Sequence, residues 1–500
     1  MASLSEKLAE SLETLKRLQL CGNIVRSSDL SRTHKERLVK TGFLQEIING
    51  WYIVCRPDSG IGNSASWYTT FWEFISVYLN TRFGSNWWLS PEQSLLLHAG
   101  NNHIPRQLIV RSPLAGNNNI QLKYGTSVFD FKSNKPKDII TKDNLQILPL
   151  AEALIESTPD FFIRHPLDAR TVLSMIQDSS EVLPHLLEGG HSVIAGRLIG
   201  AFNNIGRKRV ADDISKTMKS AGYVISANDP FEVELPTILD VREISPYVNR
   251  IKLMWQQMRE AVADNFPKPP DVIVKSSEYL KQITDIYVND AYNSLSIEGY
   301  NVTEKLIEKV RKGNWNPDKN DSDKEQLNAV AARGYWQAFQ SVKISIKEIL
   351  KGGNPGIICS NDHGNWYREL FSPGVTAGIL RPSDLAGYRN DQVYINGSMH
   401  VPLRPEAVRD AMPAFFDLLK EENDPLVRAV LGHFIFVYIH PYMDGNGRIA
   451  RFLMNAMLAS GGYKWTIIPV DKRLAYMECL EKASIDNNIV PFTKFISGII

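Results

Sequence analysis

A twelve-residue loop between two apolar segments constrains this chain more than any other feature. The loop runs from His440 to Arg451 and reads HPYMDGNGRIAR. Residues 426–439 before it are almost continuously apolar, over a length that favours a buried helix rather than a strand. After it, apolar residues from Ile449 to Leu458 recur at helical spacing, and Gly461 and Gly462 end that pattern. The sequence therefore predicts a short loop held between two core helices.

This loop contains residue types that suit the binding of phosphate. Gly445 and Gly447 flank Asn446 in a turn that opens a helix, where bare backbone N–H groups and the helix dipole attract an anion. Arg448 and Arg451 lie three residues apart. Both therefore lie on roughly one face of the first turn, where their guanidinium groups donate paired hydrogen bonds to phosphate oxygens. The segment predicts a phosphate cradle.

Two more side chains bring chemistry to the cradle. Asp444 offers a hard oxygen ligand where Mg²⁺ would bridge it to phosphates. His440 titrates near neutral pH and is a candidate general base. A lone histidine at a helix end is more often structural, and a lone Gly-x-Gly is a weak signal. The conjunction of base, carboxylate, glycines and paired arginines favours nucleotide binding with a base for an attacking group.

The segment resembles the signature of the Fic family, His-Pro-Phe-x-Asp-Gly-Asn-Gly-Arg-x-x-Arg, with Tyr442 in place of Phe. The resemblance covers about residues 276–500 and implies an all-α Fic domain with a β-hairpin flap. It also implies a protein adenylyltransferase, which uses Mg²⁺ and transfers AMP from ATP to a Ser, Thr or Tyr hydroxyl of a target protein or of itself.

The same resemblance implies a role for each motif residue. His440 deprotonates the target hydroxyl, which attacks the α-phosphate, and Asp444 holds Mg²⁺. Tyr476 matches a position that lines the adenine pocket, although a core tyrosine is the alternative. Six positions are assigned to nucleotide binding: Gly445, Asn446, Gly447, Arg448, Arg451 and Tyr476.

A flap segment precedes the motif. The stretches 392–395 and 399–402 surround Asn396-Gly397, a turn pair that predicts a second hairpin. The hairpin resembles the family's flap, which holds an extended piece of target protein by strand pairing. The positions assigned to target docking are Gln392, Val393, Tyr394 and Ile395.

A control element is also expected. Ser294, Glu298 and Gly299 fit the pattern Ser/Thr-x-x-x-Glu-Gly/Asn of the family's inhibitory helix. A solvated glutamate at a helix end is the alternative. If the resemblance holds, Glu298 forms a forked ion pair with Arg451 and misplaces the triphosphate.

The first 60 residues predict a winged helix-turn-helix. Helical patterns at 4–20 and 32–41 are followed by two short apolar runs around Asn49-Gly50, which is a hairpin signal. Residues 20–56 resemble the N-terminal domain of abortive-infection antitoxin regulators. The second helix has a basic face of candidate DNA contacts: Arg32, Lys35, Arg37 and Lys40. A solvated helix in a protein-interaction domain explains this face equally well.

The rest of the chain divides by composition. Residues 61–225 predict a small α+β domain of unknown role, residues 226–275 a connecting region, and residues 276–500 the Fic domain. The whole protein is thus expected to be mainly α.

The net charge and the cysteine spacing indicate where the protein acts and what it binds. A net charge of +1 gives no field that would attract nucleic acid to the whole chain, and the four cysteines are scattered. There is no leader-like N-terminus and no apolar run that would span a membrane. We expect a cytoplasmic protein that does not bind membranes, with homo-oligomerisation left open.

Two functions of different kinds fit these observations. The first is an autoinhibited protein adenylyltransferase. The second is a DNA-binding transcription regulator whose Fic part senses nucleotide. Removal of AMP from a modified protein at the same site also stays open.

Overall fold

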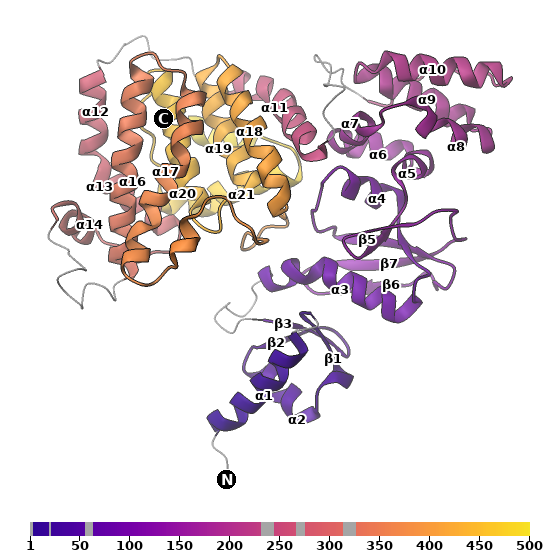
Figure 1. Cartoon of the computed structure of the whole chain (residues 1–500), viewed down its shortest axis with the longest axis horizontal. Coiled ribbons are helices and arrows are strands. Elements are labelled where there is room, and N and C mark those ends of the chain that lie inside the picture. The colour runs from indigo at the N-terminus through magenta and orange to yellow at the C-terminus, as the bar shows by residue number, and fades with distance from the viewer. Residues whose placement is uncertain (1–3, 20–21, 56–63, 232–244, 267–275, 314–326) are drawn as a thin grey trace. The chain divides into compact units, whose positions relative to one another are not determined.

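The computed structural model describes residues 4–19, 22–55, 64–231, 245–266, 276–313 and 327–500. The chain forms two compact units: Met1–Pro246 with Tyr394–Val401, and Tyr247–Val393 with Pro402–Ile500. Parts of the predicted connecting region, residues 232–244 and 267–275, lie outside the described residues. The helices and strands are shown in Figure 1. None of the described helices combines the length and the apolar character needed to cross a membrane.

The N-terminal unit begins with the helices and hairpin that the sequence predicts. Its first elements are α1 Leu4–Gln19, β1 Ile24–Arg26, α2 Arg32–Lys40, β2 Leu44–Ile48 and β3 Trp51–Val54. Gly50 has φ 82°, as a tight hairpin turn requires. The sheet order is β1-β3-β2, so β1 adds a strand that the sequence did not predict. A winged helix-turn-helix stays a prediction for this segment.

A mixed region follows in the same unit. It contains a four-stranded mixed sheet and a separate two-stranded antiparallel sheet. The order of the larger sheet is β4 (Trp88–Leu89), β5 (Gln107–Ser112), β7 (Ser127–Lys132) and β6 (Asn119–Gln121), with β5 and β7 parallel. In the smaller sheet, β8 (Ile140–Lys142) pairs with β9 (Leu145–Ile147). The helices of this region are α3 Ala65–Phe83, α4 Pro91–His98, α5 Leu150–Glu156, α6 Pro159–Arg164, α7 Pro166–Met175, α8 Leu183–Glu188, α9 Ser192–Asn204 and α10 Lys208–Ser220. The α+β character predicted for this stretch is present.

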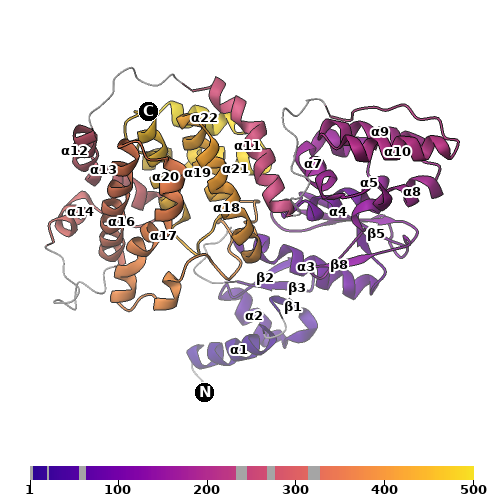
Figure 2. The same ribbon diagram turned by 45° about the horizontal axis from the view of Figure 1, so that its top comes forward.

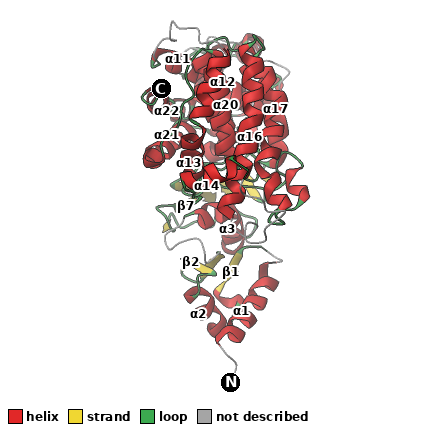
Figure 3. Cartoon of the chain, turned by 90° about the vertical axis from the view of Figure 1, so that its left-hand side faces the viewer, coloured by secondary structure: helices red, strands yellow, loops and turns green. Residues whose placement is uncertain are grey.

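In the C-terminal unit, the described regular elements are all helices, which loops connect; Figure 3 draws the helices in red. Its helices are α11 Pro246–Asp264, α12 Ser276–Asp285, α13 Tyr287–Ile297, α14 Glu304–Arg311, α16 Leu327–Leu350, α17 Pro355–Thr376, α18 Pro405–Glu421, α19 Pro425–Ile439, α20 Asn446–Ser460, α21 Arg473–Ile485 and α22 Val490–Ser497. The predicted mainly α fold is confirmed.

The predicted flap hairpin is present as a turn without paired strands. Ser398 N donates to Ile395 O at 3.1 Å, which closes the turn at Asn396-Gly397. The two arms on either side of this turn form no strand ladder. An isolated two-stranded hairpin is marginal in water, and Pro402 has no N–H to donate. Side chains join the arms instead, since Gln392 Nε2 donates to Pro402 O at 2.9 Å.

A tight helix pair supports the site. In the C-terminal unit, α16 packs along α17, and α20 packs against α16, α17 and α19 (Figure 2). At Gly334 in α16, an added Cβ would lie 1.9 Å from the backbone oxygen of Leu370 in α17. Glycine is therefore required at this crossing, because any larger residue would push the two helices apart.

We predict that Gly334→Ala destabilises the C-terminal unit by about 1–3 kcal/mol, the usual cost of overpacking a close contact. The measurement is chemical denaturation followed by circular dichroism. Gly364→Ala is the matched control, since its Cβ would meet only Arg368 Nη1 at 3.6 Å. That change should be neutral or stabilising by up to about 1 kcal/mol through helix propensity. Equal effects of the two changes would contradict the packing argument.

Candidate active site

The motif occupies a loop between two buried helices, as predicted. Helix α19 ends at Ile439, and His440 follows in the left-handed conformation with φ 55° and ψ 62°. Gly445 has φ 81° and precedes α20, which begins at Asn446. A left-handed histidine before a proline is a strained conformation that the surrounding contacts must hold.

Asn446 and Tyr442 fix the shape of this loop. The Asn446 side chain accepts from Tyr442 N at 2.9 Å and donates to Tyr442 O at 2.8 Å. The Tyr442 ring is buried and stacks on Tyr367, with ring centroids 4.0 Å apart. Asn446 therefore closes the turn in this structure, and the aromatic ring at position 442 supplies the packing.

His440 presents one nitrogen as an acceptor. Its Nδ1 lies 3.1 Å from Val437 O, and only an N–H makes a hydrogen bond with a carbonyl oxygen. The Nε2 atom is therefore unprotonated in the neutral ring. Burial lowers the pKa of His440 to about 4, against a smaller opposing effect of the Val437 hydrogen bond, and the charge of Arg389 lowers it further. His440 is thus a neutral base at pH 7.

The two arginines of the cradle are buried and incompletely paired. Arg448 is 1% exposed, and its guanidinium carbon lies 5.0 Å from the centre of the Phe371 ring and 5.3 Å from that of Tyr300. Its Nη2 lies 3.1 Å from Asp444 Oδ2. Neither Arg448 Nε nor Arg451 Nη1 has a hydrogen-bond partner. Because unpaired buried donors are costly, this arrangement fits an anionic ligand.

Arg451 is engaged by the predicted control element. Its Nη2 donates to Glu298 Oε1 at 2.6 Å and to Ser294 O at 3.1 Å. Its Nε donates to Ser294 Oγ at 2.9 Å. The predicted ion pair is therefore present, with one carboxylate oxygen rather than a fork. Ser294 lies in α13, Glu298 caps its C-terminal end, and Gly299 follows with φ 88°.

The Glu298 carboxylate lies against the phosphate cradle itself. A Cβ added to Gly447 would be 2.5 Å from Glu298 Oε1. Burial raises the pKa of Glu298, but the charges of Arg451 and Arg448 outweigh burial, so the pKa lies below its ordinary value. Likewise the carboxylate outweighs burial and raises the pKa of Arg451. Both groups are charged near neutral pH, and a carboxylate lies where the sequence predicts phosphate.

Sequence reasoning missed the anchor of α13. Asp290 is buried and accepts from Tyr335 Oη at 2.7 Å and from Trp465 Nε1 at 2.8 Å. Burial raises its pKa to about 6, and these two donors oppose that shift. Asp290 precedes Ser294 by four residues and Glu298 by eight, which places the three on one helix face. In the sequence, the four-residue spacing of Asp290 from Ser294 is the one feature that would have indicated this contact.

Tyr476 lies in the core. It belongs to α21, is 1% exposed, and its Oη is 2.7 Å from His433 Nε2. This buried environment is the one expected for a tyrosine of the hydrophobic core, rather than for one that lines an adenine pocket. Asp444 is different, because its side chain is 61% exposed while its Oδ2 pairs with Arg448.

The residues predicted to dock a target protein are divided between the two compact units. Gln392 and Val393 belong to the C-terminal unit, whereas Tyr394 and Ile395 are grouped with the N-terminal unit.

The basic face of α2 is partly used within its own unit. Arg37 Nη1 donates to Lys7 O and to Ser11 Oγ, both at 2.6 Å. Lys35 Nζ donates to Ser27 Oγ at 2.7 Å, and Arg32 pairs with Glu36 at 2.7 Å. Lys40 and Arg32 are exposed. The contacts of Arg37 join α1 to α2, so this residue has a structural role whatever the unit binds.

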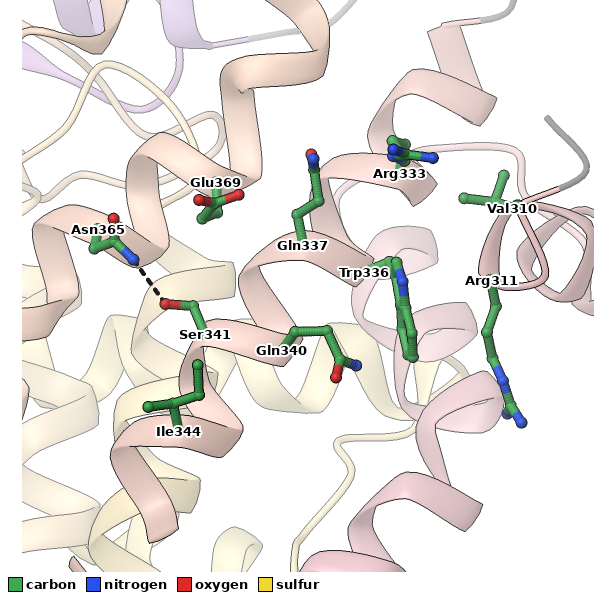
Figure 4. A pocket seen from close by; sticks show the side chains of 11 residues that line it. Val310, Arg311, Arg333, Trp336, Gln337, Gln340, Ser341, Ile344, Asn365 and Glu369 are labelled. Atoms are coloured by element: carbon green, nitrogen blue, oxygen red, sulfur yellow. Dashed lines mark hydrogen bonds between the residues drawn. The ribbon is translucent and has the colours of Figure 1, made fainter. Parts of the chain in front are cut away.

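The C-terminal unit also contains a hollow of about 420 Å³ on the side of α16 (Figure 4). It is bordered by α14 and α17, and on one side Asn365 Nδ2 donates to Ser341 Oγ at 2.8 Å. No motif residue lines it. The chemistry predicted from the sequence is therefore not located there.

Comparisons with known proteins agree with the motif. Residues 362–458 match the Fic/DOC family, so the chain contains a Fic domain. The protein adenylyltransferase Fic of Nematostella vectensis is 28% identical over 252 residues, which is 50% of this chain and 55% of that protein. Its counterpart in Drosophila willistoni is 31% identical over 221 residues, or 43% and 40% of the two chains. The chain spans about half the length of these relatives.

Solved structures of Fic proteins are also similar. One is Fic-1 (residues 134–508) from C. elegans, with 18% identity and a TM-score of 0.37, covering 70% of this chain and 88% of that one. Another is a Fic family protein from Desulfovibrio desulfuricans, with 18% identity and a TM-score of 0.34, covering 51% and 72%.

We predict that His440 stays neutral to well below its ordinary pKa of about 6.5. In NMR titrations of protein labelled at histidine, its ring resonance should shift with a midpoint near pH 4. As the pH falls below about 6.5, the unfolded chain binds a proton at this residue while the folded chain does not, so stability falls toward pH 4. The His440→Ala spectrum assigns the resonance. A midpoint at about 6.5 would contradict the buried base.

Proposed function

We propose that this protein is an autoinhibited protein adenylyltransferase, which transfers AMP from ATP to a Ser, Thr or Tyr hydroxyl of a target protein or of itself. The observation that carries the proposal is the contact of Glu298 with Arg451 at the N-terminus of α20. A buried arginine beside a glycine turn suits a phosphate group, and here the chain places its own carboxylate against that arginine. The names of the relatives agree with this activity.

The chemical step uses a neutral base. His440 Nε2 accepts the proton of the target hydroxyl, whose oxygen then attacks the α-phosphorus of ATP. The bond from the α-phosphorus to the oxygen that bridges it to the β-phosphate breaks, and pyrophosphate leaves. Arg448 and Arg451 would hold the β- and γ-phosphates, while the amides of Gly445 and Gly447 would steady the α- and β-phosphates. The low pKa of His440 keeps its lone pair available at neutral pH.

Mg²⁺ fits this donor set. The exposed carboxylate of Asp444 is a hard oxygen ligand beside the cradle. No cluster of three or more metal-ligand side chains occurs among the residues that the structure describes. Mg²⁺ is commonly held in proteins by one or two carboxylates together with substrate phosphates. When bound, the ion would neutralise charge on the phosphates.

Autoinhibition follows from competition for Arg451. One guanidinium cannot hold both Glu298 and the γ-phosphate. ATP that enters beside the carboxylate would place its α-phosphorus out of line with the target hydroxyl. Misplacement of about 1 Å costs on the order of a hundredfold in rate.

The alternatives are separated by one measurement. Mass spectrometry of the full chain, with Glu298 replaced by Gly, is carried out after incubation with ATP and Mg²⁺. A gain of one AMP supports the proposal. ATP binding without any transfer favours a nucleotide-sensing module of a regulator. Loss of AMP from a modified target protein, at a rate that depends on His440, favours de-AMPylation.

We predict that His440→Ala abolishes AMP transfer and leaves ATP affinity largely unchanged. The imidazole acts on the incoming hydroxyl and not on the nucleotide. Transfer is measured with labelled ATP and affinity by calorimetry, both in the Glu298→Gly chain. A parallel loss of affinity and transfer would contradict this division of roles.

We predict that Glu298→Gly raises AMP transfer at least tenfold, with a smaller effect on ATP affinity, because it frees Arg451. Adding Arg451→Ala to this variant should remove the gain. Glu298→Gln keeps the side-chain size without the charge and should give an intermediate rate. If Glu298→Gly leaves the rate at the original level with saturating ATP and Mg²⁺, Glu298 is not an inhibitor.

A further inference from the structure

Arg389 joins the flap segment to the catalytic loop. Its side chain is 2% exposed, and each of its guanidinium nitrogens donates to a main-chain carbonyl. Nε donates to His440 O at 2.7 Å, Nη1 donates to Asp391 O at 3.0 Å, and Nη2 donates to Leu403 O. Its backbone N donates to Pro441 O at 2.9 Å. One residue therefore holds both ends of the flap segment and the backbone of the candidate base.

The two flap contacts take the place of a strand ladder. Asp391 and Leu403 lie at the start and the end of the flap segment, which has no paired strands among its described residues. A planar guanidinium offers donors at fixed angles, so it sets the separation of these two carbonyls more firmly than a flexible ammonium would. Gln392 adds a second link, from its amide to Val393 O at 3.2 Å and to Pro402 O at 2.9 Å. These bonds of Gln392 stay within the flap segment, whereas Arg389 extends the link to the backbone of His440.

The hydrogen bond from Arg389 to His440 lies at the strained position of the loop. The backbone of His440 is in the left-handed conformation, which few residues other than glycine adopt without support from their surroundings. Its carbonyl lies at the C-terminal end of α19, where the helix dipole favours a cation. The bonds of Arg389 to the carbonyls of His440 and Pro441 therefore stabilise the turn that aims the imidazole.

We propose that Arg389 is a positioning residue that sets the distance between a target hydroxyl, held on the flap, and His440 Nε2. This inference rests on the proposed function. Arg389 touches neither substrate nor reacting atoms in this role. It acts by holding the two ends of the flap, which belong to the same compact unit as His440, at a fixed distance from the base. A displacement of about 1 Å costs on the order of a hundredfold in rate.

The test compares Arg389→Lys and Arg389→Gln in the full-length Glu298→Gly chain. Lysine keeps the positive charge but cannot reach all three carbonyls, whereas glutamine loses both charge and fork. We expect self-adenylylation to fall on the order of a hundredfold in both variants, with ATP affinity unchanged.

The pH dependence distinguishes positioning from a general loss of structure. Arg389 lowers the pKa of His440, while Glu298 and Asp444 raise it. In the Glu298→Gly chain, glutamine at 389 should therefore move the acid limb of the rate profile, and the NMR midpoint of His440, to higher pH. Lysine should leave both nearly in place. A uniform loss of ATP binding in the two variants would instead indicate a structural role and overturn the proposal.

Gln392→Ala is the matched control. It loosens the flap but touches neither the His440 carbonyl nor its charge environment, so the NMR midpoint of His440 should not move. If the Glu298→Gly parent transfers no AMP, the proposed function fails, and the NMR midpoints still test the contact with the base. If the parent is active and both Arg389 variants match it, the positioning role of Arg389 is refuted.

Discussion

The site depends on one electrostatic constraint, which is that two buried guanidinium groups at a helix N-terminus require an anion. Arg448 and Arg451 are almost fully buried, and each has an N–H without a hydrogen-bond partner. Burying such donors is costly unless a negative group compensates them. In this structure the compensation at Arg451 comes from Glu298. In the proposed mechanism, Glu298 and the γ-phosphate compete for Arg451, so the group that compensates this buried charge would also control the site.

The sequence allowed prediction of the parts of the site that depend on local chemistry. The loop from His440 to Arg451 contains its own turn glycines, and the apolar segments on either side have the periodicity of buried helices. The hairpin at Asn49-Gly50 followed for the same reason, since its turn residues lie within the hairpin. The pairing of Glu298 with Arg451 is long-range, and it became predictable only because a short motif resembled a known control element.

Contacts between distant segments were the parts that sequence reasoning missed. Asp290, Tyr335 and Trp465 come from three separate segments, and no local pattern predicts that their side chains meet. Nothing in the sequence distinguishes Arg389 from other basic residues. Its hydrogen bond to the His440 carbonyl forms only in the folded chain. The flap shows the opposite error, because a strong turn signal does not supply the strand pairing that extended arms need. These cases share one physical cause: their energies come from packing of elements that are remote in sequence.

The anchors of α13 determine how its carboxylate can leave the cradle. Asp290 is fixed by two donors from rigid aromatic side chains, Arg473 Nε donates to Ile297 O at 2.7 Å, and Asn293 Oδ1 accepts from Val470 N at 2.9 Å. Moving the whole helix would break these bonds together and leave a buried carboxylate without partners. Turning the Glu298 side chain away breaks only the pair with Arg451, since Glu298 lies at the helix end, next to a glycine. In the proposed autoinhibition, a change at the C-terminal end of α13 would therefore free Arg451 at a lower cost than displacement of the helix.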